Sequence, residues 1–458
     1  VAVNDRTLHA EVHTAIPCQL HGDTLWLSHP DRDLPGCVLL TVPGADTAQW
    51  TLRLPLREGD AGALPSAVAF DRMTTRAAAL LGAGAQLDLP DAGLQDLWRA
   101  LLLQLPLFTR DGVMQYGLFP GVYEGGLFGV EEGWDLVALS QYGHSAPAQA
   151  ALRRTFLADD FLKREGPHHQ YRNGLAITYA LDVCQMGWAH AVLHDLWPTL
   201  RGCADWIVDS LRSTRDERTD LGRAVHAGLM PKHIYGGDLR RPAYSLYATS
   251  ACWRGLRDAA RVATTIGENE TAAHYLQEAA RARADLHACA AAIFRAQGKP
   301  PYLPFATDED GDVPGSGDYY QLFASLVLET AAFGWSGSWA RILTDYLDAT
   351  GRMVVGVPRF DVWFGRLAID AEYARGALLA ALHRREFDRF YLGVIGQVAL
   401  SCDPFTFVSP ETAVVLFSRD EYQDRMRALS RQGCRADSDP CSAGTGVMLQ
   451  YLRSLLVF

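Results

Sequence analysis

Carboxylate side chains stand in three segments of this 458-residue chain that are rich in glycine, proline and aromatic residues. These segments are Phe128-Gly-Val-Glu-Glu-Gly-Trp-Asp135, Tyr235-Gly-Gly-Asp238 and Ser409-Pro-Glu411. Glycines let the backbone approach a ligand closely, and loops carry binding residues more often than other segments do. Aromatic rings can stack on a flat, polar ligand, and carboxylates accept hydroxyl protons. We therefore expect a site that binds sugars.

The elements that position these segments are predicted to be paired helices. From Asp91 onward, apolar residues recur at helical spacing in about twelve runs, which form about six hairpins. Terse joints such as Ile266-Gly-Glu-Asn alternate with long, polar joints, and long joints without structure of their own are usually functional. In a closed ring of hairpins the long joints fall at one end, where they can build a single pocket.

The N-terminal part has a different pattern. Residues 1–60 contain short, partly alternating apolar runs between Pro, Gly and Asp turns, which predicts a small β domain, perhaps part of a β-sandwich. A linker follows over residues 61–90, and residues 91–458 form the helical domain.

These features together resemble the six-hairpin glycosidases, whose catalytic domain is an (α/α)6 toroid. Glucoamylases, trehalases, processing α-glucosidases, α-L-rhamnosidases and maltose phosphorylases belong to this group. The three carboxylate segments named above carry the resemblance, which covers about residues 85–458. It implies a mainly α fold with a small N-terminal β domain, and it implies a glycoside hydrolase, most simply an inverting one.

The resemblance also implies a catalytic pair. In this superfamily the acid usually comes from the loop between the fifth and sixth helices, and the base from the loop before the last helix. At the matching positions stand Asp238, the candidate acid, and Glu411, the candidate base. The simpler interpretations are a turn cap for Asp238 and a carboxylate in the first turn of a helix for Glu411.

Other residues are candidates for binding substrate hydroxyls. Glu132 and Asp135 are three apart and can share one helix face, whereas adjacent Glu131 is expected to point elsewhere. Trp134 is either a sugar platform or a core residue. Asp370 and Glu372 are two apart on an expected helix, so they should not both face the pocket. The remaining candidates are His168, His169, Tyr171 and Arg172 in one expected loop, together with Tyr235, Asp318 and Trp363.

Three alternatives stay open at this point. Polysaccharide lyases on α/α toroids use Tyr with His, Asn and Arg, and the segment around Tyr171 offers those types. A phosphorylase or a non-catalytic carbohydrate-binding protein would suit the same fold.

The remaining observations bound the function. A net charge of −11 argues against general nucleic-acid binding and against docking on an anionic membrane. No apolar run reaches the roughly 18–20 residues of a membrane span. The nine cysteines show no zinc-like spacing, and the chain has no phosphate-cradling glycine loop, so neither metal nor cofactor is expected. The expected partner is an oligosaccharide or glycoside. No signal-peptide pattern is present, and both the compartment (cytoplasmic or secreted) and the oligomeric state stay open.

Overall fold

We describe the protein from a computed structural model. Before residue 66 it describes only the backbone of five strands, and side chains are described from residue 71 onward. From 66 to 457 it describes all residues except 118–128, 164–165, 167–168, 187–189, 221, 235–240, 298, 310–318, 361–367, 403–406, 410, 412 and 415–440.

The chain divides into two compact units, and the second begins at Leu81. In the first unit, strands β1 (Ala2–Asn4), β2 (Thr7–His13) and β5 (Cys37–Thr41) form an antiparallel sheet in the order β1-β2-β5. Strands β3 (Cys18–His21) and β4 (Thr24–Leu27) form a hairpin, and helix α1 (Ser66–Ala83) follows. The sandwich assignment and the domain boundaries at 60 and 90 stay predictions.

Within the described part of the second unit, six inner helices alternate along the chain with outer helices. The inner helices are buried on nearly all sides, which is typical of a helix enclosed by others. They are α3 (Val130–Gln141), α6 (His169–Met186), α8 (Leu246–Thr265), α10 (Tyr320–Thr330), α12 (Arg375–His383) and α15 (Ser442–Val457). The outer helices are α2 (Ala92–Gln104), α4 (Ser145–Thr155), α7 (His190–Arg215), α9 (Asn269–Ile293), α11 (Ser338–Ala349) and α13 (Phe387–Ser401).

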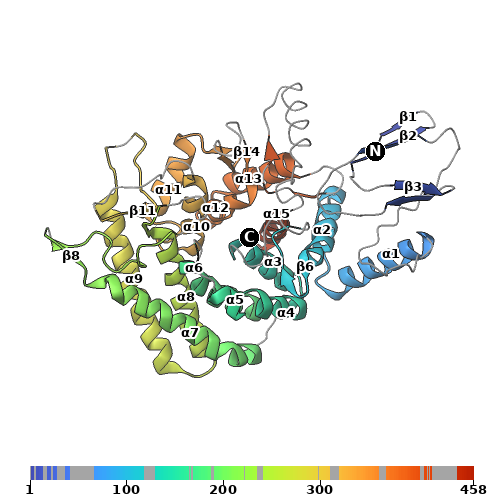
Figure 1. Cartoon of the computed structure of the whole chain (residues 1–458). Coiled ribbons are helices and arrows are strands. Elements are labelled where there is room, and N and C mark those ends of the chain that lie inside the picture. The colour runs from blue at the N-terminus through green and yellow to red at the C-terminus, as the bar shows by residue number, and fades with distance from the viewer. Residues whose placement is uncertain are drawn as a thin grey trace. The chain divides into compact units, whose positions relative to one another are not determined.

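The inner helices close into a ring (Figure 1). The last of them, α15, lies against the first, α3: the Tyr142 hydroxyl, just after α3, donates to the Leu449 carbonyl at 2.8 Å, and Gln450 Nε2 donates to the Trp134 carbonyl at 2.8 Å. Helices α6 and α8 approach most closely where two glycines meet, because a Cβ on Gly255 would lie 2.6 Å from Gly174 Cα. The predicted (α/α)6 toroid is therefore confirmed.

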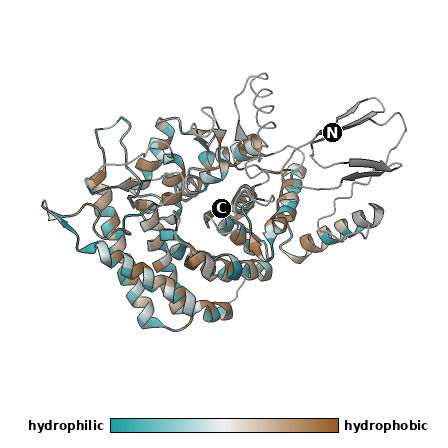
Figure 2. Ribbon diagram, in the orientation of Figure 1, coloured by the Kyte–Doolittle hydropathy of each residue, from teal (hydrophilic) through white to brown (hydrophobic). Residues whose placement is uncertain are grey.

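Short elements occupy the joints. A four-stranded antiparallel sheet has the order β12-β13-β14-β15, and β14 leads directly into the 3-10 helix η2 (Ala371–Ala374). The β8–β9 hairpin is hydrophilic (Figure 2). The other short elements are η1 (Leu105–Phe108), α5 (Asp159–Leu162), β6 (Thr109–Arg110), β7 (Val113–Met114), β8 (Arg218–Thr219), β9 (Gly222–Arg223), β10 (Tyr244–Ser245), β11 (Ala306–Thr307), β12 (Met353–Val354), β13 (Val357–Phe360), β14 (Ala368–Ile369) and β15 (Ala413–Val414).

Two expected boundaries near the candidate site were wrong. Helix α6 begins at His169, so part of the expected polar loop is helical. The helix expected over Leu367–His383 begins only at Arg375, because Ile369 pairs with strands on both sides and Asp370 is held at φ −121° and ψ 84°. None of the described helices has an apolar stretch long enough to cross a membrane.

Candidate active site

The N-terminal ends of the inner helices meet at one rim of the toroid. The Tyr373 hydroxyl of η2, just before α12, donates to the Glu131 carboxylate of α3. Cys441, which immediately precedes α15, lies with its Sγ 3.7 Å from Glu372 Oε1. In α6 and α8, the rings of Tyr171 and Tyr247 have centroids 4.9 Å apart. Among the described residues, side chains from distant joints are thus brought to one end.

Four carboxyl groups gather at this rim, and we call Glu131, Asp370, Glu372 and Glu411 the rim cluster. Glu131, Asp370 and Glu372 are 3%, 5% and 0% exposed, whereas Glu411 is half-buried. Asp370 and Glu372 are hydrogen-bonded to each other, and the charge of Glu411 acts on both. The expectation that Asp370 and Glu372 cannot face one site was wrong, because Asp370 precedes the 3-10 helix in extended backbone rather than lying within an α-helix.

The rim cluster has unusual proton affinity. Burial, together with the charge of Glu132, raises the pKa of Glu131 to about 8. Burial and the charge of Glu411 raise the pKa of Glu372 to about 8. Burial raises the pKa of Asp370 well above its usual value, and Glu372 and Glu411 raise it further. Glu131 and Glu372 therefore hold protons near neutral pH, where an ordinary carboxyl group is ionised.

Three oxygens of the cluster have no hydrogen-bond partner among the described residues: Glu131 Oε2, Asp370 Oδ1 and Glu372 Oε2. Buried polar atoms are nearly always hydrogen-bonded in folded proteins. Such atoms in a group of carboxyls are well suited to bind the hydroxyl groups of a ligand. The described part of the chain contains no group of His, Cys, Asp or Glu arranged to hold a metal ion.

At the start of α3, the two adjacent glutamates have roles opposite to those expected. Glu132 Oε2 accepts a hydrogen bond from the Gly129 backbone N–H at 2.9 Å and so caps the helix. Glu131, expected to point elsewhere, instead reaches Tyr373 and the rim cluster. The reason is the capping box: the third residue of the helix folds back onto the capping residue, which leaves the second residue to face the site.

Trp134 and Asp135 are both buried within the helix packing. Trp134 is 1% exposed and its Nε1 donates to Glu329 at 3.0 Å, which favours the interpretation as a core residue over that as a sugar platform. Asp135 packs against α15 so closely that a Cβ on Gly446 would lie 2.2 Å from Asp135 Oδ1. Burial raises the pKa of Asp135, and the charges of Glu132 and Glu131 raise it further. The substrate-binding roles of both residues stay predictions.

The segment expected as a polar loop before α6 gives a mixed outcome. Arg172 is 1% exposed and its guanidinium lies 5.2 Å from the centre of the Phe161 ring, and its role as a substrate contact stays a prediction. Tyr171 is buried and lies close enough to the rim cluster that the charge of Glu131, together with burial, raises the pKa of its hydroxyl. His169 is half-buried, with its ring 5.3 Å from that of Trp206.

Asp238 falls outside the described residues, and its role stays a prediction. The same holds for the substrate contacts proposed at His168, Tyr235, Asp318 and Trp363. Three residues beside the rim cluster were not among the candidate site residues: Tyr116, Tyr373 and Cys441. Tyr373 directly follows Asp370-Ala-Glu372, so its position gave a local signal. Tyr116 and Cys441 lie far apart in the sequence, and backbone contacts join their segments. One of these is the 2.9 Å hydrogen bond from the Ser442 N–H to the Tyr116 carbonyl.

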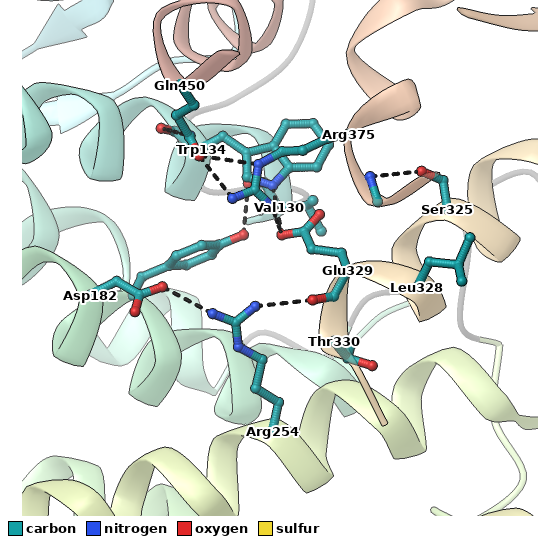
Figure 3. Close-up of polar contacts among 12 residues, drawn as sticks. Val130, Trp134, Asp182, Arg254, Ser325, Leu328, Glu329, Thr330, Arg375 and Gln450 are labelled. Carbon is teal, nitrogen blue, oxygen red and sulfur yellow. Dashed lines mark hydrogen bonds and ion pairs between the residues drawn. The ribbon is translucent and has the colours of Figure 1, made fainter. Parts of the chain in front are cut away.

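An ion-paired layer lies close to the rim cluster, since Trp134 is three residues after Glu131 and Arg375 is three residues after Glu372. Figure 3 shows this layer, in which Glu329 Oε1 of α10 is ion-paired with Arg375 Nη1 of α12. The Glu329 backbone carbonyl accepts from Arg254 Nη1 of α8 at 3.3 Å. Arg254 Nη2 is 3.1 Å from Asp182 Oδ2. Beside this layer is a cavity of about 20 Å³, lined in part by Tyr179, Tyr247 and Glu329. That is room for about one water molecule.

The fold is similar to those of several solved structures. A structure titled "Glycosidase Wild Type" matches with a TM-score of 0.56 and 13% identity, over 80% of this chain and 99% of that chain. A glycosidase variant in complex with glucose matches with a TM-score of 0.54 and 14% identity, over 80% and 99% of the two chains. A GH78 family rhamnosidase of Bacillus sp. GL1 matches with a TM-score of 0.51 and 11% identity, over 81% of this chain and 36% of that chain.

No protein-family model matches the sequence, and no curated protein is significantly similar to it. At these low identities the structural likeness establishes the (α/α)6 fold.

Proposed function

We propose that this protein is a glycoside hydrolase and that the rim cluster is its active site. The observation that carries the proposal is the convergence of four carboxyl groups, three of them with raised pKa values, at the end of the toroid where the inner helices begin. Enzymes place carboxyls in this way when one group must hold a proton and another must be ionised. Glycosidases with the same fold, one of them bound to glucose, support a carbohydrate substrate.

The proposed mechanism is inverting hydrolysis. Asp238 donates its proton to the glycosidic oxygen as the bond from that oxygen to the anomeric carbon breaks. Glu411 takes a proton from a water molecule, whose oxygen bonds to the anomeric carbon from the opposite face. The half-exposed position of Glu411 beside two buried, protonated carboxyls supports its role as the base. Burial favours the neutral form of Asp370 and Glu372, so Glu411 is the member of this trio best placed to be ionised.

The remaining members of the cluster have binding roles in this proposal. A protonated carboxyl can donate one hydrogen bond and accept others, so it can recognise a sugar hydroxyl in either direction. Glu131 is the best described alternative to Asp238 as the acid, because it holds a proton near neutral pH and is oriented by Tyr373.

The lyase alternative has less support. A lyase needs a tyrosine that gives up its proton easily and a cation that neutralises a uronate. Burial and the charge of Glu131 instead raise the pKa of Tyr171 well above 10. Among the described residues, the groups that act most strongly on Glu131, Asp370 and Glu372 are acids and hydroxyls rather than cations.

The test is an activity screen with nuclear magnetic resonance detection of the first product anomer. Neutral di- and oligosaccharides, aryl glycosides and uronate-containing polysaccharides are offered with and without phosphate. We expect release of a saturated sugar of inverted configuration, independent of phosphate. Retained configuration would overturn the inverting mechanism, and phosphate dependence would identify a phosphorylase. Ultraviolet absorbance of an unsaturated uronate would identify a lyase, and saturable binding without turnover would identify a binding protein.

A further inference from the structure

A closed chain of contacts connects Glu329 with the side chains of the rim. Glu329 Oε1 accepts from Trp134 Nε1 at 3.0 Å and is ion-paired with Arg375 Nη1. Arg375 Nη2 and Nε donate to Gln450 Oε1 at 2.8 and 3.1 Å, and Gln450 Nε2 donates to the Trp134 carbonyl at 2.8 Å. The contacts therefore join α3, α10, α12 and α15 around one carboxylate (Figure 3).

This closed chain supports the rim cluster from one side. Trp134 is three residues after Glu131, and its ring meets that of Tyr373 edge-on with centroids 5.7 Å apart. Tyr373 in turn donates to Glu131, and Arg375 is three residues after Glu372. Residues three apart on a helix are neighbours, so a shift of Trp134 or Arg375 moves the rim carboxyls with it.

We infer that Glu329 is a positioning residue of this site, which holds Trp134 under Glu131 and Tyr373 and balances the charge of Arg375 beside the rim cluster. The inference rests on the proposed function. It assigns to Glu329 a role in keeping Glu131 and Glu372 protonated, because an unbalanced cation would favour their ionised forms. Glu329 itself does not touch the substrate.

The pKa values of two tyrosines respond to charges from both the ion-paired layer and the rim cluster. Tyr179 is influenced by Glu329, Arg375, Arg254 and Glu131 together. Tyr451 is influenced by Arg375, Glu329 and Glu372. The groups that act on Glu131 also include Glu132, Glu372 and Tyr373, and those that act on Glu372 are Glu411, Asp370 and Cys441. Arg375 and Glu329 thus act on two tyrosines on which Glu131 or Glu372 also acts, and Trp134 and Tyr373 give the direct contact between this pair and the rim cluster.

The test is Glu329→Gln, whose amide oxygen can still accept from Trp134 while the charge is lost. We expect the pH above which hydrolysis declines to fall by about one unit. This is the lower end of the pKa shift that a neighbouring opposite charge produces in a carboxyl group. We expect kcat/KM near neutral pH to fall about tenfold, because Glu131 and Glu372 bind substrate in the proposed function and would hold their protons less tightly. Glu278→Gln is the matched control, since Glu278 is also buried and Arg-paired but lies between α7 and α9. It should move neither quantity.

Two further variants separate geometry from charge. Trp134→Phe removes the indole donor but keeps the Glu329–Arg375 pair, so it should lower kcat/KM without changing the pH at which hydrolysis declines. Glu329→Gln combined with Arg375→Met removes both charges and should restore the wild-type pH at which hydrolysis declines. If Glu329→Gln alone does not fold, this double variant still tests whether the pair of charges is balanced.

A second measurement does not depend on hydrolysis. Infrared titration of the protonated-carboxyl band, with Glu131→Gln and Glu372→Gln used to assign it, follows the rim carboxyls in the free protein. In Glu329→Gln the band should disappear at a lower pH than in the wild type. If the wild type hydrolyses no glycoside, the proposed function fails and this titration still tests the inference. An unchanged band, or an unchanged pH profile with kcat/KM within about twofold of the wild type, would overturn the inference.

Discussion

Two buried groups of carboxyls in the same toroid are treated in opposite ways. In the outer layer, Glu278 of α9 is 1% exposed and forms ion pairs with three arginines. Its carboxylate oxygens lie 2.8 Å from Arg212 Nη2, 3.1 Å from Arg215 Nη1 and 3.1 Å from Arg281 Nη1. Burial alone would raise the pKa of Glu278, but the hydrogen bonds from Arg212 and Arg215 outweigh it and lower the pKa. At the rim, burial and like charges raise the pKa of Glu131.

The difference teaches how to distinguish a structural acid from a candidate functional one in this fold. An acid that stabilises the helix packing is given arginine partners, which offset the cost of burying its charge. The rim acids are given other acids and hydroxyl groups, so they keep protons that chemistry can use. Strongly perturbed pKa values in an enclosed site are a general sign of function. The predictions below test whether this contrast is real.

The largest expected effect is on catalysis. Glu411→Gln and Asp238→Asn keep the shape of each side chain and remove its proton transfer, which typically contributes about 10²–10⁴-fold to the rate. Glu278→Gln should hydrolyse substrate at the wild-type rate per folded molecule. The measurement is kcat on the best substrate of the screen. Near-normal hydrolysis by Glu411→Gln or Asp238→Asn would remove that residue from the mechanism, and Glu131 would become the next candidate for the acid.

The second effect is on stability at the rim. The folded pKa of Glu131, about 8, lies above the ordinary value of 4.5, so the folded protein binds a proton more tightly than the unfolded chain. This favours folding at low pH, and the benefit is lost as the pH rises toward 8, by about 1.4 kcal/mol per pH unit. Glu131→Gln keeps a neutral side chain and should gain stability relative to wild type over that range. Urea unfolding at several pH values measures the difference, and a gap that does not grow with pH would contradict the raised pKa.

The third effect is the opposite trend in the outer layer. Because the pKa of Glu278 is lowered on folding, its ion pairs stabilise the protein above pH 4.5, and that benefit is lost as the pH falls through the lowered value. Glu278→Gln should cost about 1.5–3 kcal/mol at neutral pH, as for the loss of hydrogen bonds to a charged group. The same urea series should show this cost shrinking toward acid pH. A cost that is constant with pH would mean that packing, and not charge, explains it.

The smallest effect is the pH dependence of the wild type. If substrate binding needs protons on Glu131 and Glu372, kcat/KM should fall as the pH rises through about 8, by about tenfold per unit for one group. The pH profile of kcat/KM checks this directly. In Glu131→Gln the midpoint should then report Glu372 alone. A flat profile from pH 7 to well above 8 would show that the rim protons are not required.

Local sequence patterns were sufficient for the architecture. The spacing of apolar residues predicted each outer helix close to its observed position, for example Ser338–Asp348 against the observed Ser338–Ala349. A helix buried on one face repeats its apolar residues every three to four positions, and that signal needs no knowledge of its neighbours. The alternation of terse and long joints then indicated a ring, and the carboxylates in those joints indicated where to look for chemistry.

The roles of individual side chains could not be decided in this way. Glu131 and Glu132 are adjacent and chemically identical, and only the capping contact with Gly129 decides which of them faces the site. Asp370 and Glu372 meet because β14 pairs with its neighbours and delays the start of the helix, which is a tertiary event. Trp134 was ambiguous until Glu329, 195 positions away along the chain, was found to accept its indole N–H.

The sequence by itself therefore determined the helices and their order, because these depend on residue type and local spacing. The tertiary structure decided which acids keep protons and which are paired with arginine. Proton affinity depends on burial and on charges a few ångströms away, and those neighbours come from parts of the chain that only the closed ring brings together.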